Sequence, residues 1–210
     1  MAISLDGPRV PPAKGPADRL VVFVHGYGAD GNDLIGLGGE WQRLLPTAAF
    51  VSPNGPQPCE GAPMGRQWFP ISRLDPAEMV RGVESAAPIL NAFIDAELAR
   101  LNLDASRLSL VGFSGVLTGP EKLLNEIQSK PPVLLIHGDE DPMIPVQALY
   151  MSANGLAGAG VPVRWHVSRG IGHGIGPDGL ELGGKFLVDA YAGKLSAGGG
   201  TAPVSAKSAG

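Results

Sequence analysis

The sequence lacks the features that mark several common protein classes. It contains one cysteine, Cys59, so no disulfide can form within the chain, as is typical of a reducing, cytoplasmic setting. Charged residues make up only 17% of the 210 residues and the net charge is −4, which argues against a nucleic-acid partner. The longest apolar runs, 20–24 and 133–136, are too short to span a bilayer.

The two ends differ in composition from the rest of the chain. Residues 1–14 are rich in proline and have no apolar core, so we expect an N-terminal extension without a signal peptide. Residues 193–210 consist mainly of glycine, alanine and serine and are predicted to form a disordered, low-complexity tail. The segment between them, 15–192, is long enough for one domain with a sizeable core.

The apolar pattern of this segment predicts an α/β fold. The 31 glycines and 20 prolines predict many turns and short elements. Short β-branched runs predict strands at 20–24, 49–51, 108–114, 133–136 and 163–167. Helical spacing predicts helices at 76–103, with a kink at Pro88, and at 120–129, 145–157 and 180–192. This alternation predicts a mostly parallel sheet flanked by helices.

A serine directly follows the third expected strand. Ligands of open parallel sheets bind beyond the carboxyl ends of the strands. Ser114 comes two residues after Gly112, as in the nucleophile elbow Gly-x-Ser-x-Gly, but Val116 takes the place of the second glycine. Because the motif is incomplete, a serine in an ordinary turn is the competing interpretation.

An acid and a histidine follow the next two expected strands. Asp139 and Asp141 follow the fourth strand, and either carboxylate could orient an imidazole there. His173 lies between two glycines beyond the fifth strand, which suits an exposed general base. Ser114, Asp141 and His173 occur in the chain order of α/β-hydrolase triads, and we predict that they form one. A metal site formed by His137 and the two aspartates is a less favoured alternative.

Several segments resemble the phospholipase/carboxylesterase family of α/β-hydrolases, which includes acyl-protein thioesterases. They are residues 25–33, 65–70, 103–107, 111–114, 137–142 and 172–175. The resemblance covers about residues 15 to 190. It implies hydrolysis of carboxylic esters or thioesters of small or acyl-chain substrates, without metal or cofactor. A homodimer is possible on the same grounds.

The resemblance also assigns site residues. Ser114 matches the nucleophile, Asp141 the acid and His173 the base. The amides of Tyr27 and Gly115 match the donors that stabilise the oxyanion. Trp68 and Phe69 resemble a wall of the acyl pocket, and an ordinary packed aromatic pair is the alternative there.

The sequence departs from the family after the nucleophile strand. Family members have a second Gly-Phe-Ser segment after a long helix and a further strand, whereas here one segment, 112–114, takes both places. Ser114 and Asp141 are about half as far apart in sequence as the resemblance implies. We therefore expect one central strand and the nucleophile helix to be missing. The alternative function is a catalytically inactive homologue or a binding module that keeps the pocket.

Overall fold

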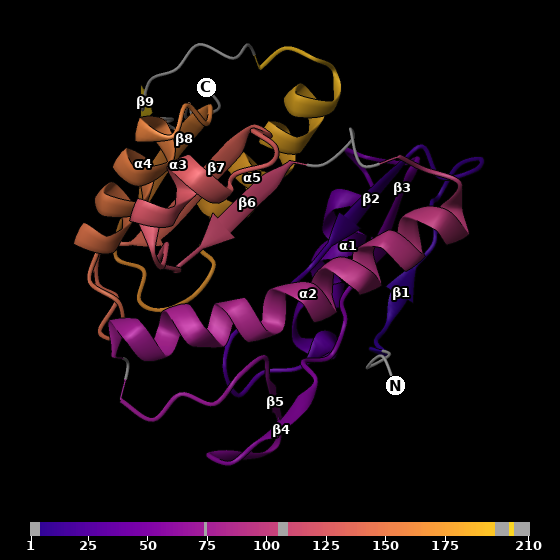
Figure 1. Cartoon of the computed structure of the whole chain (residues 1–210). Helices are drawn as coiled ribbons and strands as arrows, with labels where there is room; N and C mark the ends of the chain where they lie inside the picture. Colours follow the sequence, from indigo (N-terminus) through magenta and orange to yellow (C-terminus); the bar gives the residue numbers. More distant parts are fainter. Residues whose placement is uncertain (1–4, 74, 105–108, 196–201, 204–210) are drawn as a thin grey trace. The chain divides into compact units, whose positions relative to one another are not determined.

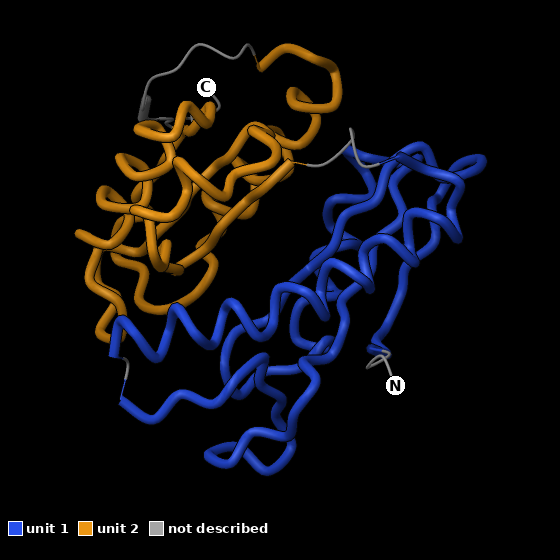
Figure 2. Tube along the Cα trace, in the orientation of Figure 1, with its two compact units in different colours: residues 1–107 blue, residues 108–210 orange. Residues whose placement is uncertain are grey.

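The structure is a computed structural model that describes residues 5–73, 75–104, 109–195 and 202–203. The chain divides into two compact units, residues 1–107 (unit 1) and residues 108–210 (unit 2), which are coloured separately in Figure 2. Each unit contains its own sheet and its own helices (Figure 1). The single domain over 15–192 stays a prediction. Most of the expected tail, and residues 1–4 of the expected extension, lie outside the described residues.

The sheet of unit 1 has a fully buried central strand. Its order is β1-β3-β2, with β1 (Arg9–Val10), β3 (Ala48–Val51) and β2 (Arg19–Val22). Strand β2 is parallel to β3 and β1 is antiparallel to it. Since side chains alternate along a strand, Ala49 and Val51 join one cluster with Phe93 of helix α2 (Pro76–Leu101). This cluster joins α2 to the sheet.

Helix α1 (Gly31–Trp41) in unit 1 was not expected from the sequence. Asp30 begins it with a capping box: its carboxylate accepts the amide of Asn32, and the Asp33 carboxylate accepts the amide of Asp30. A β-carbon on Gly38 would lie 3.1 Å from the ring of Phe50. The glycine therefore lets the helix pack closely on β3. A hairpin of β4 (Gln57–Cys59) and β5 (Ala62–Gln67) completes this unit's strands.

Helix α2 matches its expected start. Asp75 caps it by accepting the amides of Ala77 and Glu78, and Pro76 occupies the first turn, where its missing N–H is harmless. The helix passes through Pro88 and ends before Asn102, whose φ of 54° is left-handed. The helical periodicity of the sequence thus predicted this element to within two residues.

The sheet of unit 2 is parallel throughout the residues that the structure describes. Its order is β6-β7-β8-β9, with β6 (Leu110–Phe113), β7 (Val133–Gly138), β8 (Val163–Ser168) and β9 (Ala202–Pro203). This confirms the mostly parallel sheet. Strand β9 comes from the segment that was expected to be a disordered tail, and it pairs with β8.

Helices cover both faces of this sheet. Val133 of β7 belongs to an apolar cluster with Ala153 and Leu156 of helix α4 (Gln147–Gly158). The next residue, Leu134, belongs to a second cluster with Phe186 of helix α5 (Pro177–Tyr191). Because β7 is apolar on both faces, it reads as a continuous hydrophobic run. Because β6, β7 and β8 are parallel, the loops that follow these three strands gather at one end of the sheet.

The connection from β6 to β7 is short. It contains the 3₁₀ turn η2 (Pro120–Lys122) and the single-turn helix α3 (Leu123–Glu126), so the predicted helix over 120–129 was too long. Strand β6 nevertheless pairs directly with β7, from Leu110 with Val133 to Phe113 with Ile136. The strand that precedes Ser114 and the strand that precedes Asp141 are therefore neighbours.

No helix within the described ranges combines the length and the apolar character needed to cross a membrane.

A buried carboxylate connects α2 to the N-terminal strand in unit 1. The side chain of Glu97 is 6% exposed, and its two oxygens accept hydrogen bonds from the guanidinium groups of Arg9 and Arg100. Burial raises the pKa of Glu97, but the hydrogen bonds and charges of the two arginines outweigh burial and lower it. The carboxylate is therefore charged at neutral pH.

We expect Glu97→Gln to lower the free energy of unfolding by about 1–3 kcal/mol at neutral pH, because the amide has no charge to pair with the two arginines and its NH2 group cannot accept from either guanidinium. Since the pKa of Glu97 is lowered, its stabilisation is present above the unfolded value of 4.5 and is lost as pH falls through the folded-state pKa. Urea unfolding at neutral and acidic pH measures both effects. Glu40→Gln, at an exposed partner of Arg43, is the control and should change stability by less than roughly 0.5 kcal/mol. Equal losses in the two variants would contradict this account.

Candidate active site

Ser114 lies in a sharp turn at the end of β6. Its amide donates to the carbonyl oxygen of Ile136 at 2.9 Å, which continues the β6–β7 ladder by one residue. Its φ is 48°, in the left-handed region that residues with a side chain rarely occupy. Such strain is frequent at functional sites. The side chain is directed at the loop after β8, where its hydroxyl donates to the carbonyl oxygen of Gly174 at 3.1 Å.

No helix follows Ser114 directly. Residues 115–119 have no regular structure, and η2 begins only at Pro120. Leu117 is held instead by its amide, which donates to the hydroxyl of Ser152 on α4 at 2.9 Å. Ser114 therefore lacks a following helix whose N-terminus would face a group bound at its hydroxyl.

Asp141 lies in the turn after β7 with its side chain fully buried. One oxygen, Oδ1, accepts the amides of Met143 and Ile144 at 2.8 and 2.9 Å. The other, Oδ2, lies 2.9 Å from Nδ1 of His173. Burial raises the pKa of Asp141, but the amide hydrogen bonds and His173 outweigh burial and lower it. The charged acid thus requires a proton on Nδ1, and the neutral ring then has a free lone pair on Nε2.

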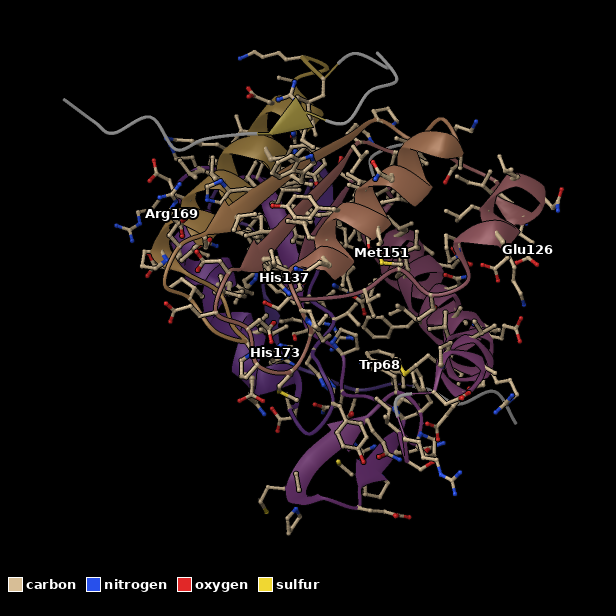
Figure 3. The ribbon with its side chains drawn as sticks, turned by 90° about the vertical axis from the view of Figure 1, so that its left-hand side faces the viewer. Trp68, Glu126, His137, Met151, Arg169 and His173 are labelled. Carbon is tan, nitrogen blue, oxygen red and sulfur yellow. The ribbon has the colours of Figure 1, made fainter. Side chains whose placement is uncertain are left out.

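A second imidazole contacts the same carboxylate. His137, at the end of β7, is almost completely buried, and its Nε2 lies 2.8 Å from the carbonyl oxygen of Ile144 and 3.2 Å from Oδ2 of Asp141. Because a carbonyl oxygen only accepts, this Nε2 carries the proton. Both histidines are labelled in Figure 3, at one end of the unit 2 sheet. His137 therefore fixes the turn that carries Asp141.

The loop that carries His173 is bound to the turn after β7. Asp139 accepts the amide of Gly170 at 2.6 Å, and the amide of Glu140 donates to the carbonyl oxygen of Ile171 at 3.0 Å. A β-carbon on Gly138 would lie 2.1 Å from that same carbonyl oxygen. The two loops therefore approach each other so closely that only glycine fits. The two candidate acids also have different partners, since Asp139 holds the loop and Asp141 contacts the imidazole.

The structure brings the three residues of the predicted triad to one end of the unit 2 sheet. One hydrogen bond of the triad is formed, between Asp141 and His173. Among the described residues, Ser114 makes no hydrogen bond to His173, because its hydroxyl is bonded to the carbonyl of the next residue, Gly174. The His173 side chain is 39% exposed, so its ring is accessible to solvent.

The alternative metal site finds no support in the described geometry. No three His, Cys, Asp or Glu side chains of the described part converge on a point that could hold a metal ion. His137 donates its Nε2 proton to the carbonyl oxygen of Ile144, and Asp139 accepts the amide of Gly170, so both groups already have other partners.

The other predicted site residues belong to unit 1, apart from Gly115. Tyr27 follows β2 and is half exposed. Trp68 donates from Nε1 to the carbonyl oxygen of His25 at 3.0 Å, and its ring packs against the α2 cluster. Phe69 lies so close to α2 that a β-carbon on Gly82 would be 2.2 Å from its ring. Both aromatic rings are thus packed within unit 1.

Sequence reasoning missed two groups at this site. His137 was considered only as a metal ligand, although its position four residues before Asp141, across a turn, could have indicated a contact with that acid. The carbonyl of Gly174 has no sequence signal, because a backbone acceptor is present at every position.

Comparison with known families divides the chain at the short crossover. Residues 5–118 match the model described as Phospholipase/Carboxylesterase. Residues 120–183, which include Asp141 and His173, match the model described as Prolyl oligopeptidase family. The boundary falls just after Ser114, where the sequence departs from the family pattern.

Related proteins are named as thioesterases and esterases. Acyl-protein thioesterase 1 from Gibberella zeae is 27% identical over 220 residues, which cover 86% of this chain and 94% of that protein. Esterase YpfH from Escherichia coli is 26% identical over 184 residues, which cover 76% of this chain and 78% of that protein.

Solved structures of the same fold are similar over nearly the whole chain. Acyl-protein thioesterase 2 from Zea mays, with 22% identity and a TM-score of 0.60, covers 89% of this chain and 99% of its own, and shares the fold. The crystal structure of esterase PE8 has 38% identity and a TM-score of 0.85, over 90% of this chain and 100% of that one. Because the first family model covers more than half of the sequence and esterase PE8 aligns along its full length, the chain belongs to the phospholipase/carboxylesterase family of α/β-hydrolases.

Proposed function

We propose that this protein is a serine hydrolase that cleaves carboxylic esters or thioesters with Ser114, Asp141 and His173. The observation that carries the proposal is the 2.9 Å contact between the buried, charged carboxylate of Asp141 and Nδ1 of His173. An acid in this position fixes the tautomer of the imidazole and stabilises its protonated form. The names of the relatives support esters and thioesters as the substrate class.

In the proposed reaction, Ser114 attacks the acyl carbon while Nε2 of His173 takes the hydroxyl proton. The imidazolium then gives this proton to the leaving alcohol or thiol, and an acyl-enzyme remains. His173 next takes a proton from water, and the resulting attack releases the acid and restores the hydroxyl. The first step requires the Ser114 hydroxyl to leave the carbonyl oxygen of Gly174 and to donate to Nε2 of His173.

Backbone amides are proposed to stabilise the oxyanion. Preorganised N–H groups are among the strongest contributors to acyl transfer. The amide of Gly115 directly follows the nucleophile and, within the described residues, donates to no other group. We assign it as one donor; the amide of Tyr27, in unit 1, stays the second donor that the resemblance implies. Trp68 and Phe69 are proposed to form the wall of the acyl pocket. A homodimer and a cytoplasmic location remain predictions.

One observation favours the alternative of an inactive homologue or binding module. The Ser114 hydroxyl is bonded to a carbonyl oxygen instead of an imidazole, and no helix follows it to direct amides at the substrate. The same experiment decides between the two functions.

We expect the protein to hydrolyse p-nitrophenyl butyrate and to react with a fluorophosphonate probe, and Ser114→Ala to abolish labelling and lower kcat by at least roughly 10³-fold. The variant removes only the attacking oxygen. Ser109→Ala, at a serine just before β6, is the matched control and should behave as the original protein. If the original protein is cooperatively folded but is not labelled, the inactive alternative holds. If the original protein and Ser114→Ala hydrolyse the ester equally fast, Ser114 takes no part in the reaction.

We expect Asp141→Asn to lower kcat by about 10³–10⁴-fold with little change in KM, because an amide group can donate to Nδ1 and so reverse the tautomer. Asp139→Asn is the matched control, since that carboxylate accepts only the amide of Gly170 among the described groups, and we expect a loss below roughly tenfold. Steady-state kinetics with circular dichroism of each variant test this. A larger loss in Asp139→Asn than in Asp141→Asn would show that Asp139, and not Asp141, is the acid of the triad.

A further inference from the structure

A second cluster of polar side chains lies in unit 2 outside the predicted triad. Asp178 is in the first turn of α5, and its Oδ2 lies 2.7 Å from Nε2 of His166. Its Oδ1 accepts the hydroxyl of Ser168 at 2.9 Å. Ser168 is 1% exposed, so its hydroxyl requires a partner within the protein. One carboxylate satisfies both groups.

The cluster closes the base of the loop that carries His173. His166 and Ser168 lie two residues apart on β8 and therefore face the same side of the sheet. Ser168 is the last residue of the strand, and Asp178 is the second residue of the helix that follows the loop. The side-chain bonds of Asp178 thus join the point where the loop leaves the sheet to the point where it returns.

The charges of the cluster favour this contact. Burial raises the pKa of Asp178, but hydrogen bonds from His166, Ser168 and the amide of Gly179 outweigh burial and lower it. The carboxylate is therefore charged, and bonds to a charged acceptor are stronger than neutral ones. Its place at the start of α5 adds the favourable interaction of an anion with a helix N-terminus.

Packing around the cluster leaves little freedom. A β-carbon on Gly176 would lie 2.8 Å from Oδ1 of Asp178, and one on Gly179 would lie 2.9 Å from Ile136 of β7. Glycines on both sides of Asp178 thus allow the first turn of α5 to lie directly on the sheet. The first half of the loop is held elsewhere, by the bond from the amide of Gly170 to Asp139.

We propose that Asp178 is a positioning residue for His173. By fixing the end of the loop nearer α5, it sets the direction from which the imidazole contacts Asp141 and, in the proposed reaction, approaches Ser114. This inference rests on the proposed function, because the position of an imidazole affects catalysis only if the imidazole acts. Small displacements of a catalytic group lower turnover strongly while substrate binding is retained.

We expect Asp178→Ala to lower kcat for p-nitrophenyl butyrate by about 10–100-fold with KM within roughly twofold of the original protein. Asp178→Asn keeps the shape and one acceptor for Ser168, so it should recover part of the loss. Glu181→Gln is the control, because Glu181 is also an acid of α5 but is exposed and pairs with Lys185. It should leave kcat unchanged.

The NMR signal of the proton on Nδ1 of His173 provides a readout that a purely structural role would not move. This proton lies in the bond to Asp141, and we expect its chemical shift to change in Asp178→Ala and to stay constant in Glu181→Gln. Unchanged kcat and an unchanged signal in Asp178→Ala would overturn the inference, even if its melting temperature falls. If Asp178→Ala does not fold, normal turnover in both Ser168→Ala and Asp178→Asn would overturn it instead.

Labelling by the fluorophosphonate probe separates this inference from the proposed function. If the original protein is labelled at Ser114 and Asp178→Ala is labelled at the same rate, the inference fails while the hydrolase function stands. If the folded original protein is not labelled, the hydrolase function fails, and the positioning role in catalysis fails with it.

Discussion

The buried carboxylate of Asp141 is the feature on which the candidate site depends. A charged group without access to water must have its oxygens satisfied by protein donors. Here the amides of its own turn satisfy one oxygen, and two imidazoles approach the other. The buried acid therefore has all of its hydrogen-bond partners only while the turn after β7 and the loop after β8 are both in place. The electrostatic requirement of one side chain thus joins two loops into a single structure.

The parallel pairing of β6 with β7 brings the third residue to the same end of the sheet. Val133 packs against α4 on one face of β7, and Leu134 packs against α5 on the other. Helices therefore cover both faces of this strand, although the preceding crossover contains only two short turns. Apolar packing on the two faces of β7 therefore comes from α4 and α5, without a long helix after Ser114. This explains how Asp141 and His173 keep their contact beside the short segment that follows Ser114.

The sequence predicted the elements whose signals are local and repetitive. The β-branched runs indicated β2, β3, β6, β7 and β8, and helical spacing indicated α2, α4 and α5. Helix α1 was missed because glycines at 36, 38 and 39 lower its helix propensity, and Gly38 is explained only by contact with Phe50 from another element. The pairing of His173 with Asp141 could be expected from strand order. The orientation of the Ser114 hydroxyl could not, because it is set by one rotatable bond and a backbone acceptor.

The left-handed backbone of Ser114 lowers the stability of the fold, whereas the proposed reaction requires a hydroxyl at this position. A residue with a β-carbon pays about 1–2 kcal/mol for this conformation, and glycine does not. Replacement by glycine would relieve the strain and remove the hydroxyl at the same time. Laboratory evolution for heat resistance would therefore set the relief of this strain against the loss of the bond to the carbonyl of Gly174.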